Sequence, residues 1–269
     1  MGKHLKELWT YRELVYNLVV RDLKVRYKNS LLGVLWSWLN PLLMMLIFTF
    51  VFGYMWRNRT IPHPHILFLS ALLPWNFFTG AVMGGIQSVV GSSSLVKKVY
   101  FPREVLPISV VLSNLINFLI SLPVLLILII LSGIPLTGWL LLLPLPILIQ
   151  VTFAIGIVLF LSALEVFYRD THMMMDVGMQ AWFFLTPIVY TYRDLPQKAT
   201  LFGVTFNPQI WLFRLNPMAS IINTYQDLLY NGALTQLDFL ARTAVTALLV
   251  LILGYWFFIK HSKRFGEMA

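Results

Sequence analysis

The 269-residue chain has no cysteine and few charged side chains, and these two absences limit what it can be. Without cysteine it can form neither disulfide bonds nor thiolate metal sites. Charged residues make up only 12% of the sequence, whereas soluble globular proteins carry about 25%. Hydrophobic residues reach 58%, more than one soluble core of ordinary size can hide. The composition therefore indicates a membrane protein.

Motifs for nucleotide and metal chemistry are also missing from the sequence. No GxxxxGK[ST] phosphate-binding loop occurs, and neither GxSxG nor HExxH is present. His63 and His65 are the only closely spaced histidines, and no carboxylate lies near them, so we expect no metal site. We expect a chain that is not an enzyme, carries no cofactor, and obtains energy for any work from another protein.

Six apolar stretches are long enough to cross a bilayer, whose core needs about 20 helical residues. The predicted spans are 31–55, 66–89, 105–131, 140–164, 171–190 and 239–260. No internal repeat and no low-complexity linker separates them. We therefore predict an all-α membrane protein in which residues 1–269 form a single domain.

Lys and Arg residues are unevenly distributed between the two sides of these spans. Fourteen of the 20 lie in 1–30, 90–104, 165–170 and 260–269 on one side, and six lie toward the opposite side. Cytoplasmic loops carry the excess of Lys and Arg, so both termini are predicted to lie in the cytoplasm. The net charge is +9, and the basic residues cluster beside the apolar stretches. This position favours anchoring in the cytoplasmic membrane over binding to nucleic acid.

Residues 8–28 are predicted to form an amphipathic helix at the membrane surface, with Leu14 and Leu18 on its apolar face. One interpretation is a simple surface anchor. The alternative is a positively charged entrance that meets an anionic lipid head group. Its basic side chains are Arg21, Lys24, Arg26 and Lys28.

Residues 191–238 are predicted to lie on the outer side, yet they are too apolar for a solvated loop. Asn216 followed by Pro217 is typical of a helix start, and Asn231-Gly232 of a helix end. We expect short helices that dip back into the outer leaflet. They serve either as packing elements or as an outer gate.

The segment between the second and third spans is basic and aromatic. It is either an anchoring loop or a docking helix for a cytoplasmic partner, with Tyr100 and Phe101 as anchors. The residues assigned to docking are Ser94, Lys97, Lys98, Tyr100 and Phe101.

Charged residues cluster where the fourth and fifth spans meet: Glu165, Arg169, Asp170 and Asp176. Glu165 and Arg169 are spaced to pair if the fourth helix continues past its predicted end. Because a charge within a bilayer is costly, Asp176 needs a partner or water. A structural ion-pair network is favoured over a proton relay, since no second ladder of acids crosses the membrane.

Aromatic residues make up 15% of the chain, and many share helical faces in the first and fifth spans. They either face lipid and neighbouring helices or line a pore along which sugar rings can slide. The candidates for a pore lining are Trp38, Phe48, Phe52, Met175, Met179, Trp182, Phe183 and Tyr190.

Four motifs in order resemble one family of membrane proteins. They are RYKNSLLGVLWSWLNP at 26–41, KKVYFPREVLP at 97–107, FYRD at 167–170 with TPIVY at 186–190, and the Asn216-Pro217 pair. This set is similar to the permeases of type-2 ABC exporters for O-antigen, capsule and teichoic acid. The resemblance covers nearly the whole chain and shows no major departure.

The resemblance implies a homodimer of this chain with two copies of a separate ATPase, which holds ATP and Mg. It implies that the first and fifth spans line a channel and that the outer helices gate it. The basic helix would border the entry for an undecaprenyl-pyrophosphate-linked polymer. The resemblance does not decide between teichoic acid and O-antigen or capsule.

Three other functions remain open at this point. A drug or small-lipid exporter would share the family. A proton-coupled carrier would depend on Asp176 and Glu165. A membrane glycosyltransferase would need an acidic site, and Asp194, Asp227 and Asp238 are too dispersed in the sequence for one.

Overall fold

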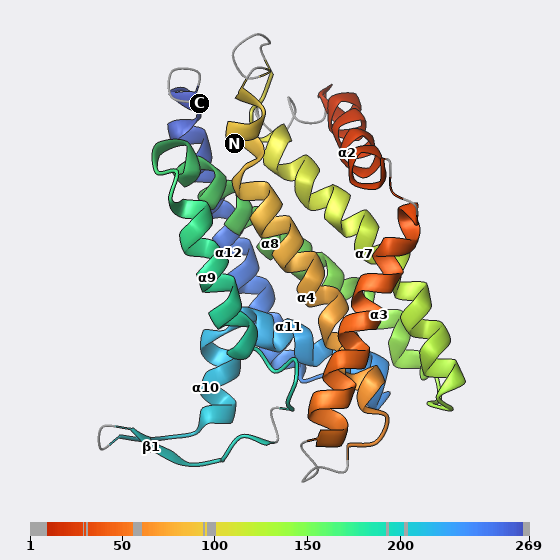
Figure 1. Ribbon diagram of the computed structural model, residues 1–269. Coiled ribbons are helices and arrows are strands. Elements are labelled where there is room, and N and C mark those ends of the chain that lie inside the picture. Colours follow the sequence, from red (N-terminus) through yellow and green to blue (C-terminus); the bar gives the residue numbers. More distant parts are fainter. Residues whose placement is uncertain are drawn as a thin grey trace.

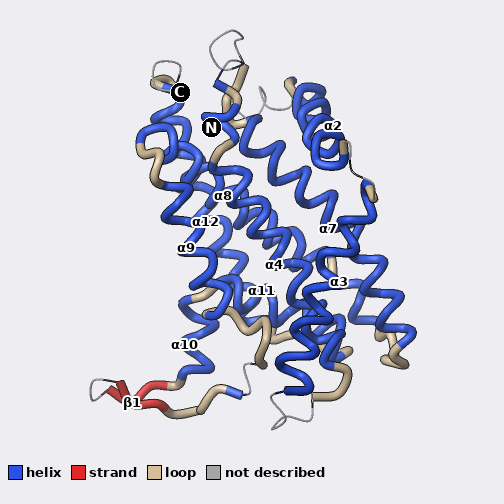
Figure 2. Tube along the Cα trace, viewed as in Figure 1, coloured by secondary structure: helices blue, strands red, loops and turns tan. Residues whose placement is uncertain are grey.

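The computed structural model describes residues 10–28, 30, 32–55, 61–93, 95, 101–191, 194–201 and 204–265. Helices make up most of this part of the chain, and the strands form one small hairpin (Figure 2). The elements are α2 (Arg12–Tyr27), η1 (Gly33–Leu35), α3 (Trp36–Phe48), η2 (Thr49–Met55), α4 (Pro64–Ile86), α5 (Ser88–Gly91), α7 (Val105–Leu131), η3 (Gly138–Leu142), α8 (Pro144–Phe167), α9 (Thr171–Phe184), β1 (Ala199–Leu201), β2 (Val204–Phe206), α10 (Pro208–Leu215), α11 (Pro217–Gln226), η5 (Asp227–Asn231) and α12 (Leu237–Ser262).

Among the described residues, five helical stretches are long and apolar enough to cross a membrane. They are Gly33–Met55, Pro64–Ile86, Val105–Leu131, Gly138–Phe167 and Leu237–Ser262. These correspond to the predicted spans one to four and six, with ends shifted by a few residues. The predicted all-α multi-pass class is therefore confirmed.

The predicted fifth span is shorter than expected. Helix α9 ends at Phe184 instead of Tyr190 and has only 14 residues, a length of about 21 Å. The cause is Pro187, which has no backbone N–H and disfavours helical geometry at the residue before it. The Thr186 hydroxyl donates to the carbonyl oxygen of Trp182 at 2.8 Å, and Ile188 N donates to Thr186 O at 2.7 Å in a tight turn.

Helix α4 forms the centre of the bundle. It packs against α3, α7, α8, α9 and α11. Most of its side chains are buried, including Phe68 and Phe78, which are fully covered. The stretches that contain α3 and α12 are as apolar as α4 but much less buried, so α4 is covered by its neighbouring helices while α3 and α12 expose apolar residues.

Helices α8 and α12 approach so closely that their backbones touch. A Cβ atom built at Gly254 would lie 2.1 Å from Gly156 O, and one built at Gly156 would lie 2.6 Å from Leu251 N. Glycines permit this kind of contact between membrane helices. The pair α8–α12 makes the most extensive helix contact in the described part of the chain.

The predicted outer segment contains the expected short helices and an additional antiparallel hairpin, β1–β2, which the sequence did not predict. Asn207 and Asn216 cap α10 and α11 through their side-chain oxygens, each followed by proline. Helix α11 is buried along its whole length and packs against α4, α8 and α12. Its insertion into the bundle positions the residues around the site described below.

The start of α2, the turn between α8 and α9, and the end of α12 lie at one end of the bundle (Figure 1). Arg103 donates a hydrogen bond to Ser262 O, and the rings of Phe167 and His261 are 5.6 Å apart. The η2–α4 link, the β1–β2 hairpin and η5 lie at the opposite end. The structure thus groups the segments rich in Lys and Arg on the same side, as the charge distribution predicts.

Candidate functional site

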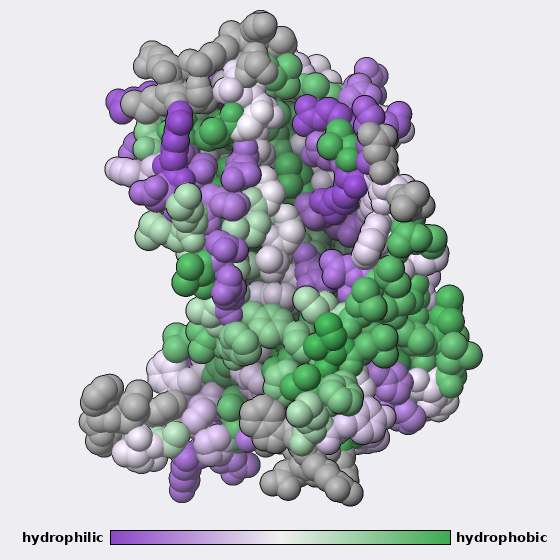
Figure 3. Space-filling model, viewed as in Figure 1, coloured by the Kyte–Doolittle hydropathy of each residue, from purple (hydrophilic) through white to green (hydrophobic). Residues whose placement is uncertain are grey.

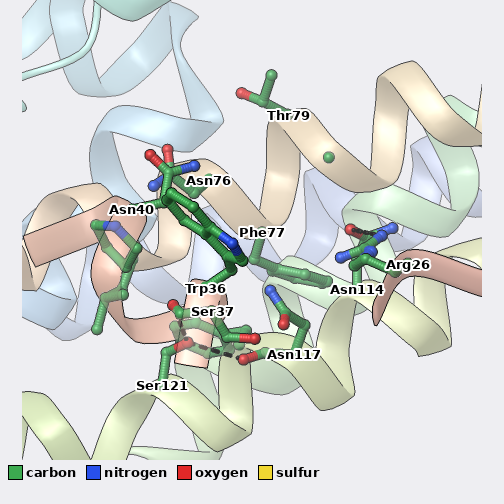
Figure 4. Close-up of a pocket in the computed structure, with 14 residues that line it drawn as sticks. Arg26, Trp36, Ser37, Asn40, Asn76, Phe77, Thr79, Asn114, Asn117 and Ser121 are labelled. Carbon is green, nitrogen blue, oxygen red and sulfur yellow. Dashed lines mark hydrogen bonds between the residues drawn. The ribbon is translucent and has the colours of Figure 1, made fainter. Parts of the chain in front are cut away.

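A polar cavity of about 370 Å³ lies where α2 ends and α3 begins, against the middle of α4 and α7 (Figure 4). We call it the asparagine cavity because four of its lining side chains are carboxamides. Arg26 is the only charged residue among those that line it. The lining consists of Arg26, Trp36, Ser37, Asn40, Pro41, Leu73, Asn76, Phe77, Thr79, Gly80, Asn114, Asn117, Phe118 and Ser121.

Tyr27, the last residue of α2, holds the three helices of this site together. Its hydroxyl lies 2.5 Å from Ser37 Oγ of α3 and donates to Asn117 Oδ1 of α7. The link from α2 to α3 includes Gly33, whose φ of 51° favours glycine. The Ser121 hydroxyl donates to Ser37 O at 3.1 Å and closes the contact between α3 and α7.

Arg26 reaches into the bundle and is held by a carboxamide. Its Nη2 donates to Asn114 Oδ1 at 3.0 Å, while Asn114 Nδ2 donates to Val110 O within α7. A Cβ atom at Gly80 would lie only 2.7 Å from Asn114 Oδ1. The missing side chain at position 80 therefore makes room for the carboxamide that orients Arg26.

Several polar groups in the asparagine cavity lack partners within the described part of the chain. Thr79 Oγ1 is buried without a hydrogen bond. Asn40 and Asn76 are exposed to the cavity and have no hydrogen bond to another described residue. An unsatisfied buried polar group costs about 1–3 kcal/mol, and this cost applies to Thr79 Oγ1. The exposed carboxamides of Asn40 and Asn76 are accessible to a polar ligand or to water.

Aromatic rings form the apolar part of the same cavity. Phe77 and Phe118 stack with ring centroids 5.6 Å apart and are almost fully buried. The indole of Trp36 remains 46% exposed. Tyr225 of α11 packs edge-on against Phe118 at 6.0 Å, and its hydroxyl donates to Gln150 Oε1 at 3.0 Å. The outer segment is thus in direct contact with the back of the cavity.

Of the four basic residues predicted for the entrance, the structure places only Arg26 in this cavity. Arg21 pairs with the neighbouring Asp22 at 3.1 Å. Lys24 and Lys28 point to the surface of α2. The assignment of these side chains to a lipid head group remains a prediction.

Sequence reasoning missed the carboxamides of α4 and α7 as site residues. Asn76, Asn114 and Asn117 each lie within a long apolar helix. A polar side chain in such a helix faces the bundle interior or a cavity, and this signal was present in the sequence. The sequence does not show how α4 is aligned against α7, and this alignment brings the three asparagines together.

The predicted pore aromatics lie mostly between α3, α4 and α9. Phe48 is 5.9 Å from Phe183, and Phe183 is 5.8 Å from Trp75, measured between ring centroids. Phe52 contacts Phe68 at 6.4 Å. In one chain these rings pack against α4, and a role in a pore formed with a second copy remains a prediction.

The remaining predicted pore residues have different surroundings. Met179 is buried, and Met175 packs against the core. Trp38 is directed toward α7, where its Nε1 donates to Ile120 O at 2.9 Å. Trp182 and Tyr190 line a second cavity of about 570 Å³ beneath α9, together with Trp211 of α10.

The predicted ion pair between Glu165 and Arg169 is not formed, because α8 ends at Phe167 and Tyr168 is extended. Glu165 is buried and accepts a hydrogen bond from His172 N at 2.9 Å, at the start of α9. An acceptor at a helix N-terminus satisfies a free N–H group and favours the helix dipole. Asp170 and Asp176 are exposed. Glu165 thus joins α8 to α9 structurally.

Most of the predicted docking residues lie outside the described residues: Ser94, Lys97, Lys98 and Tyr100. Phe101 is described and is buried in a second apolar cluster with Phe258 and Phe265. It therefore anchors this segment to α12. In the described ranges, no group of three His, Cys, Asp or Glu residues could hold a metal ion.

The face that carries the cavity is divided between polar and apolar surface. Hydrophilic side chains flank a hollow in its upper half, and a mainly hydrophobic band crosses below (Figure 3). Long apolar helices around a polar cavity define a multi-pass membrane protein. The sequence over residues 13–230 matches the ABC-2 type transporter family, and the chain belongs to this family.

Relatives are similar along their whole length. The O-antigen export system permease protein RfbA of Myxococcus xanthus is 34% identical over 267 residues, covering 99% of both chains. A protein of the same name from Klebsiella pneumoniae is 32% identical over 257 residues, covering 95% of both. The family resemblance drawn from the four motifs is thereby confirmed.

Proposed function

We propose that this chain is the permease of an ATP-driven exporter that moves a cell-surface polysaccharide, attached to undecaprenyl pyrophosphate, across the cytoplasmic membrane. The observation that carries the proposal is the end-to-end similarity to two proteins named as O-antigen export permeases. Among the possible polymers, this similarity favours O-antigen over teichoic acid. The asparagine cavity supports it, since it offers a cation and carboxamides to a polar head group.

The proposal assigns ATP hydrolysis to a separate ATPase, two copies of which would bind a dimer of this chain. Two observations support a separate ATPase. The chain belongs to a family of transporters, and its sequence contains no phosphate-binding loop. The dimer is assigned from the family resemblance. Met173, Met174, Val177 and Phe184 of α9 are more than 60% exposed, so a second copy or lipid can cover them. We assign ATPase contact to 94–101 and channel lining to the aromatics of α3 and α9.

The proposal is tested in cells that lack this permease but still synthesise the polymer. Expression of the chain together with its ATPase is expected to restore the polymer to the cell surface. The matched control pairs the same permease with an ATPase whose Walker lysine is replaced, and lipid-linked polymer should then accumulate inside. Export by the permease in cells without the ATPase would contradict the division of labour and favour an autonomous carrier.

A further inference from the structure

The asparagine cavity has two chemically different parts. Figure 4 shows Arg26 with Asn114 on one side of the cavity and the carboxamides of Asn40 and Asn76 on the other. The ring of Phe77 and the indole of Trp36 lie in the region between them. A ligand that satisfies all of these groups carries a negative charge at one end and hydroxyl groups at the other.

The charged part fits a phosphate. Arg26 donates one hydrogen bond to Asn114, and a guanidinium has five N–H donors. Among the described residues that line the cavity, Arg26 is charged and none is acidic, so their net charge is positive. Arg26 is solvent-exposed, and a guanidinium oriented by a carboxamide presents its remaining N–H donors to a phosphate oxygen.

The uncharged part fits a sugar. Carboxamides both donate and accept hydrogen bonds, as sugar hydroxyls do, and Asn40 and Asn76 are free to make them. Thr79 Oγ1 adds a buried hydroxyl without a partner. Exposed Trp36 supplies a flat apolar surface for the C–H face of a sugar ring.

The size of the cavity limits what enters. A volume of about 370 Å³ is at the small end of ligand pockets, which range over about 300–1,000 Å³. It therefore accommodates a head group and not a polymer. The site would bind the part of the substrate where the lipid pyrophosphate joins the glycan.

We infer that the asparagine cavity binds the first sugar of the lipid-linked polymer together with its pyrophosphate. Arg26 pairs with the pyrophosphate, and Asn40 and Asn76 bind hydroxyl groups of the sugar. The inference rests on the proposed function and adds to it a recognition site that residues of one protomer line.

Binding to the full chain in lipid nanodiscs tests the inference by calorimetric titration. The probes are farnesyl pyrophosphate and the same molecule carrying N-acetylglucosamine or galactose. At least one sugar-bearing probe is expected to bind about 10-fold more tightly than the sugar-free probe, the effect of one or two added hydrogen bonds. Asn40→Ala with Asn76→Ala should abolish this difference and leave binding of the sugar-free probe unchanged.

Two further variants complete the experiment. Arg26→Gln should weaken binding of all three probes. Gln87→Ala removes an exposed carboxamide at the end of α4, outside the cavity, and should change nothing. Equal affinity for sugar-bearing and sugar-free probes, or an unchanged sugar preference in the double alanine variant, would overturn the inference.

The same variants separate this inference from the proposed function when polymer export is measured in cells. If the wild-type chain exports polymer but shows no sugar preference in the titration, the proposed function stands and the inference fails. If the sugar preference is present but the polymer is not exported, the proposed function fails.

Discussion

At the residue scale, the asparagine cavity depends on small side chains as much as on polar ones. Gly80 leaves the space that the Asn114 carboxamide fills, and Asn114 in turn orients Arg26. A glycine in the middle of a helix costs about 1 kcal/mol relative to alanine, so a packing requirement offsets this cost here. Its presence in α4 is explained by the contact with α7.

Replacing Gly80 by alanine is therefore expected to impair the site without unfolding the protein. The new Cβ would lie 2.7 Å from Asn114 Oδ1 and would displace the carboxamide from Arg26. Arg26 would then have to be ordered on binding, at a cost of about 0.5–1.5 kcal/mol, so we expect up to about 10-fold weaker binding of farnesyl pyrophosphate. Calorimetric titration of the variant in lipid nanodiscs measures this change in affinity.

Gly91→Ala is the control for this variant, because an added Cβ there meets nothing within 4 Å. Both variants are expected to keep a thermal midpoint close to that of the parent chain. Unchanged probe affinity in Gly80→Ala would show that Asn114 does not position Arg26 for binding.

At the element scale, the contact between α8 and α12 is expected to limit stability. Gly254→Ala would place a Cβ 2.1 Å from Gly156 O, so the two helices must separate. Overpacking of this kind costs about 1–3 kcal/mol. Thermal unfolding in detergent should show a lowered midpoint.

Gly178→Ala provides the comparison, since Gly178 lies in α9 with only Met175 Sδ at 4.0 Å from an added Cβ. This change should leave the thermal midpoint equal or raise it, because alanine favours helix. A midpoint for Gly254→Ala as high as that for Gly178→Ala would mean that α8 and α12 adjust without loss.

Helix α11 is expected to depend on one buried network. The hydroxyl of Tyr225 donates to Gln150 Oε1 of α8, and Gln150 Nε2 donates to Pro74 O of α4. Tyr225→Phe leaves a buried acceptor without this donor, at a cost of about 1–3 kcal/mol. Hydrogen exchange should show faster exchange of the α11 amides.

A double-mutant cycle with Gln150→Leu isolates the network from other effects of each change. Removing both partners should cost less than the sum of the single changes, because neither Tyr225 nor Gln150 then leaves the other's polar atom without its partner. Strictly additive effects would indicate that Tyr225 and Gln150 are not coupled.

How much of this fold the sequence predicted differs from one element to another. Hydrophobic length located five of the helices, and the caps at Asn216 and Gly232 marked α11 and η5 correctly. The predicted C-terminal end of α9 was wrong, because apolar residues continue past the helix break at Pro187. The asparagine cavity could not be predicted, since it depends on how α4 and α7 are aligned.

At the scale of the whole molecule, the arrangement of the helices bears on the number of membrane crossings. The start of α2 and the end of α12 lie at the same end of the bundle (Figure 1). A chain whose two ends lie on one side crosses an even number of times. The described residues contain five long helices, which is one short of the predicted six, and we propose that α9 provides the sixth crossing. Its 14 helical residues cover about 21 Å of a core of about 30 Å.

We expect residues 185–190, with α10 and α11 packed beneath α9, to complete this crossing. Trp182 Nε1 donates to Asn216 Oδ1 at 2.8 Å, and Asn216 Nδ2 donates to Leu185 O at 3.0 Å, so the returning chain satisfies backbone groups at the end of α9. Irregular backbone at membrane depth is tolerated where other protein groups cover it. The break at Pro187 is thus compatible with a crossing.

Labelling of single cysteines in intact cells tests this topology, and the native chain supplies no competing thiol. Arg169→Cys, before α9, should react only after the membrane is permeabilised. Lys198→Cys, in the exposed segment before β1, should react with an impermeant maleimide from outside. If Lys198→Cys reacted only from inside, α9 would be a re-entrant helix that returns to the side it came from. The two ends of the chain would then lie on opposite sides of the membrane.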